Sequence, residues 1–229
     1  METLKVPYIK GLGEMDDRGV LLNLEESGAR FIVGHNNWPD LYPYTPLCGG
    51  EIALSDGVLA VHFHVRGLDL RAMNTEDNMR QWEDSCCELF IEDPDGGKYY
   101  NFEMNCCGKI LSASGDGRKD RVKRPLSEMG RIRRISWKPE PPASLPFNLE
   151  GDIYTWDVAA LIPLDLIGIG GNDLPESLRA NFYKCGDLTA HPHYLSWSPI
   201  GTPKPDFHRP DFFGTLILNN NRTKRQTDL

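Results

Sequence analysis

The hairpin that decides the fold is encoded by residues 81–108, QWEDSCCELFIEDPDGGKYYNFEMNCCG. Two segments flank the turn at 94–97, and apolar residues recur at every second position in both, as in a sheet with one buried face. The set predicted to face a core comprises Cys87, Leu89, Ile91, Tyr100, Phe102 and Met104. The set predicted to share the opposite face, with Trp82 at its edge, comprises Glu88, Asn101, Glu103 and Asn105.

The composition is typical of a soluble globular protein. Of 229 residues, 40% are hydrophobic and 25% are charged, which suffices for one large all-β domain. The net charge of −8 disfavours nucleic acid as a partner, because phosphates attract basic surfaces. No apolar run reaches the roughly eighteen residues of a membrane span, and residues 1–19 lack the apolar segment of a signal peptide. As it stands, the sequence therefore predicts a cytoplasmic protein.

Short alternating segments recur along the chain, and few segments have the helical period. Residues 1–50 show few long periodic segments, and only 162–167 is predicted to form a helical turn. Together these patterns predict an antiparallel β-sandwich of roughly ten strands with long loops, a single domain over 1–218 and a polar tail at 219–229. Besides the hairpin, strands are predicted at 29–33, 58–66, 109–114, 132–137, 153–161, 179–185 and 215–218.

Several polar residues allow both a functional and a structural interpretation. His62 and His64 face away from the core and could ligate a metal, but no carboxylate or cysteine nearby in the sequence completes the set. Solvated or hydrogen-bonded imidazoles are therefore the simpler interpretation. The basic segment 118–124 could bind an anion, although most charge runs are solvated loops. Six cysteines lack the spacing of a zinc site and are predicted to be mostly buried thiols.

The tryptophans separate into core and site candidates. Trp38 is predicted to cover one end of the sandwich, and Trp197 to lie in the core. Trp82 instead lies beside hydrogen-bonding groups, an arrangement that suits a polyol. A pyranose has an apolar C–H face that can stack on an indole, while its hydroxyls bind carboxylates and amides. A second ring for such a clamp is expected from the loop 203–210, PKPDFHRP, which contains Phe207 and His208.

Three motifs, taken in order, resemble those of the family 9 carbohydrate-binding modules, which occur attached to xylanases and as free-standing relatives. They are WEDSCCELFI at 82–91, FEMN at 102–105, and SWSP at 196–199 followed by FHRP at 207–210 and FGTL at 213–216. The resemblance covers roughly residues 58–218. It implies a β-sandwich that binds a mono- or oligosaccharide without catalysis, in the service of polysaccharide or oligosaccharide catabolism.

The resemblance also implies which residues contact the sugar. Trp82 and Phe207 would clamp it, with Phe207 standing where xylanase-linked members have tryptophan, and Glu88 and Asn105 match polar contact positions. Three positions depart from the pattern: Glu103 and His191 stand in place of arginines, and Tyr183 in place of an amide. The family's preference for reducing-end glucose or xylose therefore does not transfer directly. The predicted carbohydrate-binding residues are Trp82, Glu88, Glu103, Asn105, Tyr183, His191, Phe207 and His208.

Two further expectations concern metal and catalysis. Members of the family bind structural calcium, for which Glu92, Asp93 and Asp95 could supply oxygens, a plain turn being the alternative. Glu88 and Glu103 face the same way on paired strands, so a glycoside hydrolase is the alternative to binding without catalysis. A retaining enzyme would need their carboxyl groups about 5 Å apart, and an inverting enzyme about 6.5–9.5 Å apart. Their repulsion would raise one pKa, as an acid catalyst requires. A protein-interaction module that uses the aromatic loops is the third interpretation.

Overall fold

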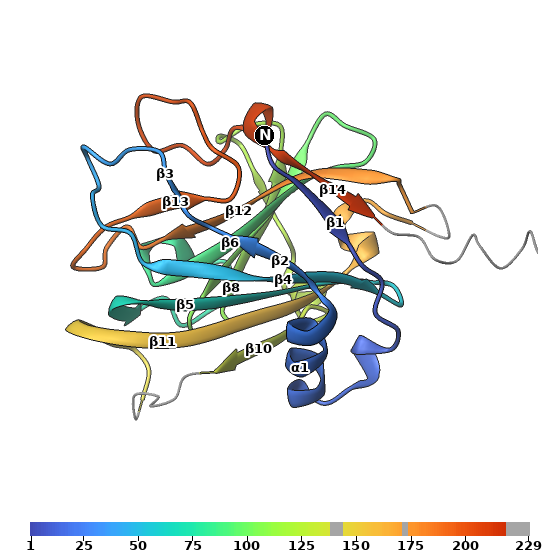
Figure 1. The fold of residues 1–229 in the computed structure, drawn as a ribbon, viewed down its shortest axis with the longest axis horizontal. Coiled ribbons are helices and arrows are strands. Elements are labelled where there is room, and N and C mark those ends of the chain that lie inside the picture. The colour runs from blue at the N-terminus through green and yellow to red at the C-terminus, as the bar shows by residue number, and fades with distance from the viewer. Residues whose placement is uncertain (138–143, 171–173, 219–229) are drawn as a thin grey trace, which may run out of the picture.

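The structure is a computed structural model that describes residues 1–137, 144–170 and 174–218. In this part of the chain, fourteen strands form two sheets that stack face to face (Figure 1). The predicted all-β sandwich is therefore confirmed. The predicted polar tail at 219–229 lies outside the described residues.

The larger sheet has nine strands, and neighbouring strands in it run antiparallel except for β1 and β14, which run parallel. The path of this sheet is β1 (Thr3–Val6), β14 (Gly214–Leu218), β12 (Ser177–Cys185), β6 (Cys86–Glu92), β7 (Tyr99–Asn105), β8 (Ile110–Gly115) and β9 (Val122–Lys123), while β13 (Tyr194–Ser196) pairs with β12 and with β3 (His35–Asn36). The five-stranded sheet has the order β10 (Arg133–Trp137), β11 (Phe147–Pro163), β5 (Val58–Ala72), β4 (Leu47–Ser55) and β2 (Ala29–Ile32).

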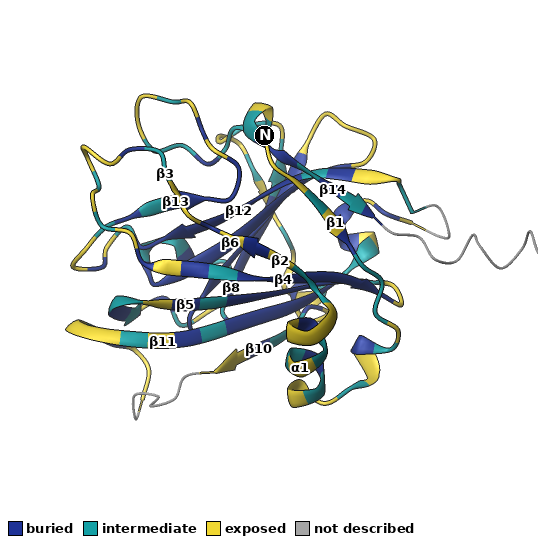
Figure 2. Ribbon diagram, in the orientation of Figure 1, coloured by how far each residue is buried: buried dark blue, intermediate teal, exposed yellow. Residues whose placement is uncertain are grey.

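The core lies between the two sheets, where buried residues gather (Figure 2). The hairpin residues predicted to face it do so, since Leu89 and Phe102 are fully buried and directly opposite each other. Across the interface, Phe31 of β2 stacks on Phe182 of β12 with ring centroids 3.9 Å apart. The period of two in the sequence thus reports a real division between an inner and an outer face.

A helix covers part of the outer face of the five-stranded sheet. This helix, α1 (Asp17–Ser27), begins where the Asp16 side chain accepts a hydrogen bond from the Gly19 amide at 2.7 Å. Val20 and Leu24, one turn apart, pack on outward-facing alanines of β4, β5 and β11. Sequence patterns alone did not reveal this helix.

The other helices are short: α2 (Leu126–Met129), η1 (Leu12–Glu14), η2 (Gln81–Glu83), η3 (Leu164–Ile167) and η4 (Pro210–Phe212). The turn predicted at 162–167 is present as η3. None of the helices in the described part of the chain combines the length and the apolar character that a bilayer crossing requires.

Truncation of Trp197 tests the packing of the core. Its indole is 6% exposed and meets the Phe182 ring edge-on at 5.2 Å. We expect Trp197→Ala to lower the free energy of unfolding by about 3–5 kcal/mol because it leaves a cavity. Urea denaturation followed by circular dichroism measures this. Trp137 is 52% exposed, so Trp137→Ala should change stability by only about 0.5 kcal/mol; equal effects of the two variants would contradict the assignment.

Candidate functional site

The outward face of the β6–β7 hairpin forms the floor of a cavity of about 360 Å³. Neighbouring outward residues of β8 and β12 extend this floor, and loops from three parts of the chain wall it. A cavity of this size is large enough for a small-molecule ligand. The lining residues are Trp82, Glu88, Phe90, Asn101, Glu103, Leu111, Ala113, Arg118, Arg121, Lys123, Cys185, Asp187, Tyr194, Pro205, Asp206, Phe207 and His208.

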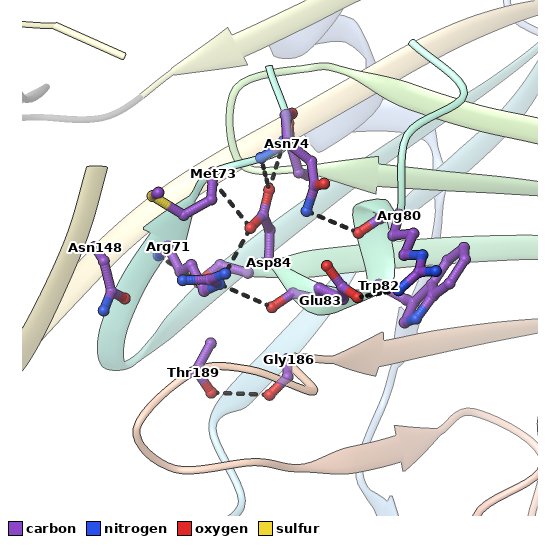
Figure 3. Close-up of polar contacts among 12 residues, drawn as sticks. Arg71, Met73, Asn74, Arg80, Trp82, Glu83, Asp84, Asn148, Gly186 and Thr189 are labelled. Carbon is purple, nitrogen blue, oxygen red and sulfur yellow. Dashed lines mark hydrogen bonds and ion pairs between the residues drawn. The ribbon is translucent and has the colours of Figure 1, made fainter. Parts of the chain in front are cut away.

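A buried carboxylate fixes the turn that carries Trp82. Asp84 directly follows η2, and its two oxygens accept hydrogen bonds from the amides of Met73 at 3.0 Å and Asn74 at 2.9 Å. The Nε atom of Arg71 lies 3.3 Å from the same carboxylate (Figure 3). Asp84 is fully buried, and these contacts pair its charge and satisfy both of its oxygens. It holds the partly buried indole of Trp82 at the cavity wall.

The Phe207 ring rests on a second aromatic ring. Tyr183 stacks beneath it with ring centroids 4.1 Å apart and planes 6° apart, and its hydroxyl donates to the Phe207 carbonyl at 3.1 Å. Trp38, which is buried as predicted, lies 6.3 Å away and donates from Nε1 to the Thr202 carbonyl at 2.7 Å. Phe207 itself is 8% exposed. Tyr183 therefore supports the ring of Phe207 and does not line the cavity.

Two carboxyl groups stand side by side on the floor. Glu88 of β6 and Glu103 of β7 are direct register partners. The Cys185 thiol donates to Glu88 Oε1 at 3.1 Å, and the Asn101 amide donates to Glu103 Oε1 at 2.8 Å. The other oxygen of Glu103, Oε2, is buried and has no hydrogen-bond partner among the described residues. A buried polar atom without a partner is costly, which indicates a position for a polar group of a ligand.

Both carboxyl groups are shifted toward the neutral form. Burial raises the pKa of Glu103 to about 8, against the smaller opposing effects of the Asn101 hydrogen bond and Arg121. Burial also raises the pKa of Glu88, and the nearby Cys185 and Glu103 raise it further. Near neutral pH the floor therefore carries carboxylic acids, which can donate a hydrogen bond as well as accept one.

The basic segment 118–124, which includes β9 beside β8, supplies a polar wall of the cavity. Arg121 donates from Nη2 to Asn101 Oδ1 at 2.7 Å, and its guanidinium lies 4.1 Å from the centre of the Tyr99 ring. Arg118 lies 3.7 Å from the Asp206 carboxylate. Arg118, Arg121 and Lys123 line the cavity, but Arg118 and Lys123 remain exposed to solvent, as the simpler interpretation predicts, and Arg121 is partly buried. The positive charge of this segment is visible in the sequence, but the residues that it contacts in the folded chain are not.

His208 lines the cavity beside this wall. Its Nδ1 lies 2.8 Å from the Tyr99 hydroxyl, and burial lowers its pKa to about 3, with Arg121 and Arg118 acting in the same direction. The ring is therefore neutral.

Two other predicted site residues, Asn105 and His191, lie outside the cavity lining. The Asn105 amide donates to the Asn74 carbonyl at 3.0 Å and accepts from the Lys109 amide at 3.0 Å, so it holds a turn. His191 Nδ1 pairs with Asp69 Oδ2 at 2.8 Å. Of the predicted set, the structure brings together Trp82, Glu88, Glu103, Phe207 and His208.

The acidic turn considered for calcium does not fit that ion. Asp93 Oδ2 accepts from the Tyr100 hydroxyl and Oδ1 accepts from the Asp95 amide at 3.0 Å. Lys98 Nζ lies 3.4 Å from Asp93, and Arg179 lies 3.9 Å from Glu92. Calcium requires six or more free oxygens, whereas these carboxylates already neutralise cations and accept donors. The turn is explained by its own hydrogen bonds.

Comparison with known proteins gives concordant findings. Residues 20–218 match the model of carbohydrate-binding family 9. A protein from Bacteroides uniformis ATCC 8492, named as a candidate carbohydrate-binding protein, is 33% identical over 95% of this chain and 99% of its own, with a TM-score of 0.86. Among curated protein sequences, none is significantly similar to this chain.

Two solved structures from Caldicellulosiruptor kristjanssonii share the fold at lower identity. A family 9 carbohydrate-binding module in complex with cellotriose is 14% identical, covers 100% of this chain and 99% of its own, and has a TM-score of 0.56. A family 9 carbohydrate-binding module in complex with glucose is 15% identical, and the match covers 97% of this chain and 98% of that module, with a TM-score of 0.50. At these identities the likeness concerns the fold alone.

The shifted pKa of Glu103 predicts how stability changes with pH. A glutamate in the unfolded chain ionises near about 4.3, whereas Glu103 in the folded protein ionises at about 8. Between these values Glu103 binds more protons in the folded protein than in the unfolded chain, so its own contribution to the free energy of unfolding should fall as pH rises from about 5 to about 8. We expect Glu103→Gln to lose this contribution, so that its free energy of unfolding falls less steeply, or rises more steeply, with pH than that of the wild type, in which the neutral His208 has the opposite effect below about pH 6.5.

Urea denaturation at a series of pH values measures how the free energy of unfolding of the wild type and of the variant changes with pH. The exposed Glu14 provides the control, because Glu14→Gln should keep the wild-type slope. An unchanged slope in Glu103→Gln would contradict the assigned protonation.

Proposed function

The chain belongs to carbohydrate-binding family 9, and from this membership we propose that the cavity above the β6–β7 hairpin binds a mono- or oligosaccharide without hydrolysing it. The observation that carries the proposal is the unpartnered Oε2 of Glu103, buried in a cavity that an indole borders. The binding would serve polysaccharide or oligosaccharide catabolism.

In this proposal, aromatic rings stack on the sugar and polar groups form hydrogen bonds with its hydroxyls. The indole of Trp82 covers one apolar face of a pyranose, and the supported ring of Phe207 meets the sugar from the other wall. Glu103 and Glu88, held neutral by burial, exchange hydrogen bonds with hydroxyls in either direction. Arg121 orients the Asn101 amide and adds donors at the edge of the cavity.

The ligands of two relatives guide the choice of sugar to test. The modules from Caldicellulosiruptor kristjanssonii were solved with cellotriose and with glucose. Glucose and short β-glucans are therefore the first probes for this chain. Acidic sugars are the informative comparison, because Arg118, Arg121 and Lys123 line the same cavity.

A glycoside hydrolase is the second candidate, because two carboxyl groups face one cavity. Retaining hydrolysis requires one ionised carboxylate as nucleophile beside a protonated acid. Here the pKa values of both Glu88 and Glu103 are raised, mainly by burial, so neither supplies that nucleophile near neutral pH. This protonation pattern favours binding over turnover.

Removal of the indole tests the clamp. Stacking one pyranose face buries about 60 Å² of apolar surface, which contributes about 1.5 kcal/mol at about 25 cal/mol per Å². We expect Trp82→Ala to raise the Kd for the bound sugar at least about tenfold with the fold intact. Isothermal titration calorimetry with glucose and cello-oligosaccharides measures the affinity.

The exposed Trp137 gives the matched control, and Trp137→Ala should bind as the wild type does. Unchanged affinity in a folded Trp82→Ala variant would refute the clamp. Absence of binding to every neutral and acidic sugar on a glycan array would refute the function itself.

Catalysis is tested separately with aryl glycosides. We expect no release of the aryl group above the background rate between pH 5 and 7, because burial holds the paired carboxyl groups of Glu88 and Glu103 mainly in the neutral form over this range. The assay follows aryl absorbance with aryl glucosides and xylosides. Release that disappears in both Glu88→Gln and Glu103→Gln would establish hydrolysis instead.

A further inference from the structure

A second polar cluster lies on the outer face of the five-stranded sheet, beneath α1. His62 and His64 project from β5 on the face opposite the core, as the sequence predicted. Glu51 of β4 is the register partner of His62, and Asp157 of β11 is the register partner of His64. Glu25 on the last turns of α1 completes the cluster. Carboxylates that are distant in sequence thus surround the two imidazoles.

His62 is buried without a hydrogen bond. Its side chain is 1% exposed, and neither ring nitrogen has a partner among the described residues. Glu51 Oε2 lies 3.6 Å from Nδ1, beyond hydrogen-bond distance. The ring nitrogens have therefore lost their hydrogen bonds to water without gaining others among the described residues, which is costly for a buried polar group.

His64 is oriented by carboxylates on both sides. Its Nδ1 lies 2.9 Å from Asp157 Oδ1, and its Nε2 lies 2.8 Å from Glu51 Oε2. In protein metal sites, a ligating histidine commonly donates its second ring N–H to a carboxylate, which fixes the ring. Asp157 is placed to accept this second N–H, that of Nδ1, from His64.

We propose that His62, His64, Glu51 and Glu25 form a binding site for a divalent transition-metal cation of the zinc type. One ligand atom from each of Glu25, His62 and His64 lies within 4.8 Å of the others. Glu51 Oε2 lies between the two imidazoles, at 3.6 Å and 2.8 Å. Four ligands at about 2.0–2.1 Å from a tetrahedral zinc lie about 3.3 Å apart, so small side-chain rotations suffice.

The donor set selects the class of metal. Two imidazole nitrogens suit zinc, cobalt or nickel, whereas calcium and magnesium prefer an all-oxygen shell. The cation would take the place of the proton between His64 Nε2 and Glu51, and that proton would leave to solvent. His64 would keep its Nδ1 proton for Asp157. The bound ion would join α1 to β4 and β5, which belong to the five-stranded sheet, whereas the floor of the cavity belongs to the nine-stranded sheet.

Cobalt(II) is the most informative probe, because its visible spectrum reports the ligands. We expect chelator-treated protein to bind one Co²⁺ per chain, with visible absorption bands of a tetrahedral centre and without a thiolate charge-transfer band. Zn²⁺ should displace Co²⁺ and raise the melting temperature, whereas Ca²⁺ should do neither. His62→Phe should weaken Co²⁺ binding by more than about 100-fold, beyond the effect typical of losing an outer partner.

Three variants make the outcome decisive. Glu51→Gln should lose Co²⁺ binding like His62→Phe, and it decides the matter if His62→Phe does not fold. Cys185→Ser is the matched control, because Cys86, Glu88 and Cys185 form the other group of closely spaced metal-ligand atoms found in the described residues. Binding that survives in the folded ligand variants, or that is lost in Cys185→Ser, would overturn the site. So would the absence of any Co²⁺ or Zn²⁺ binding to the wild type.

Discussion

The structure depends on one constraint, the alternation of side chains along the paired strands β6 and β7. On the inner side Leu89 and Phe102 meet in the core, and on the outer side Glu88 and Glu103 meet in the cavity. A shift of one residue in register would carry the acids into the core and the apolar residues outward. Packing of the sandwich therefore fixes the chemistry of the cavity, and neither can change without the other.

The neutral floor distinguishes this cavity from an ordinary acidic patch. Carboxylic acids withdrawn from water can match a sugar hydroxyl as donor or as acceptor, whereas carboxylates can only accept. The positive charge of Arg121 is meanwhile directed to Asn101 and to the face of Tyr99. The site therefore combines uncharged hydrogen-bonding groups on the hairpin with cations confined to the adjoining loop.

The hairpin could be predicted from the sequence because its signal is local, but other elements could not. Glycines at 49 and 50 obscured β4, although Gly50 is required there: a Cβ atom would lie 1.9 Å from the His62 carbonyl oxygen. Asn105 and His191 were assigned to the site by motif position, yet their partners, Asn74 and Asp69, come from elsewhere in the chain. The two histidines of β5 were judged to lack carboxylates for the same reason. In each of these cases the role of the residue depends on its contacts in the folded chain, which the residue type alone does not show.

The parallel pairing of β1 with β14 has a mechanical consequence. Thr3 lies opposite Thr215 and Val6 opposite Leu218, so the chain enters at one end of this ladder and departs at the other. Tension applied across the two ends would pull the strands past each other lengthwise. The hydrogen bonds between them would then bear the load together, in shear, instead of opening one after another like a zipper. A domain pulled from both ends would therefore resist stretching along the paired strands β1 and β14.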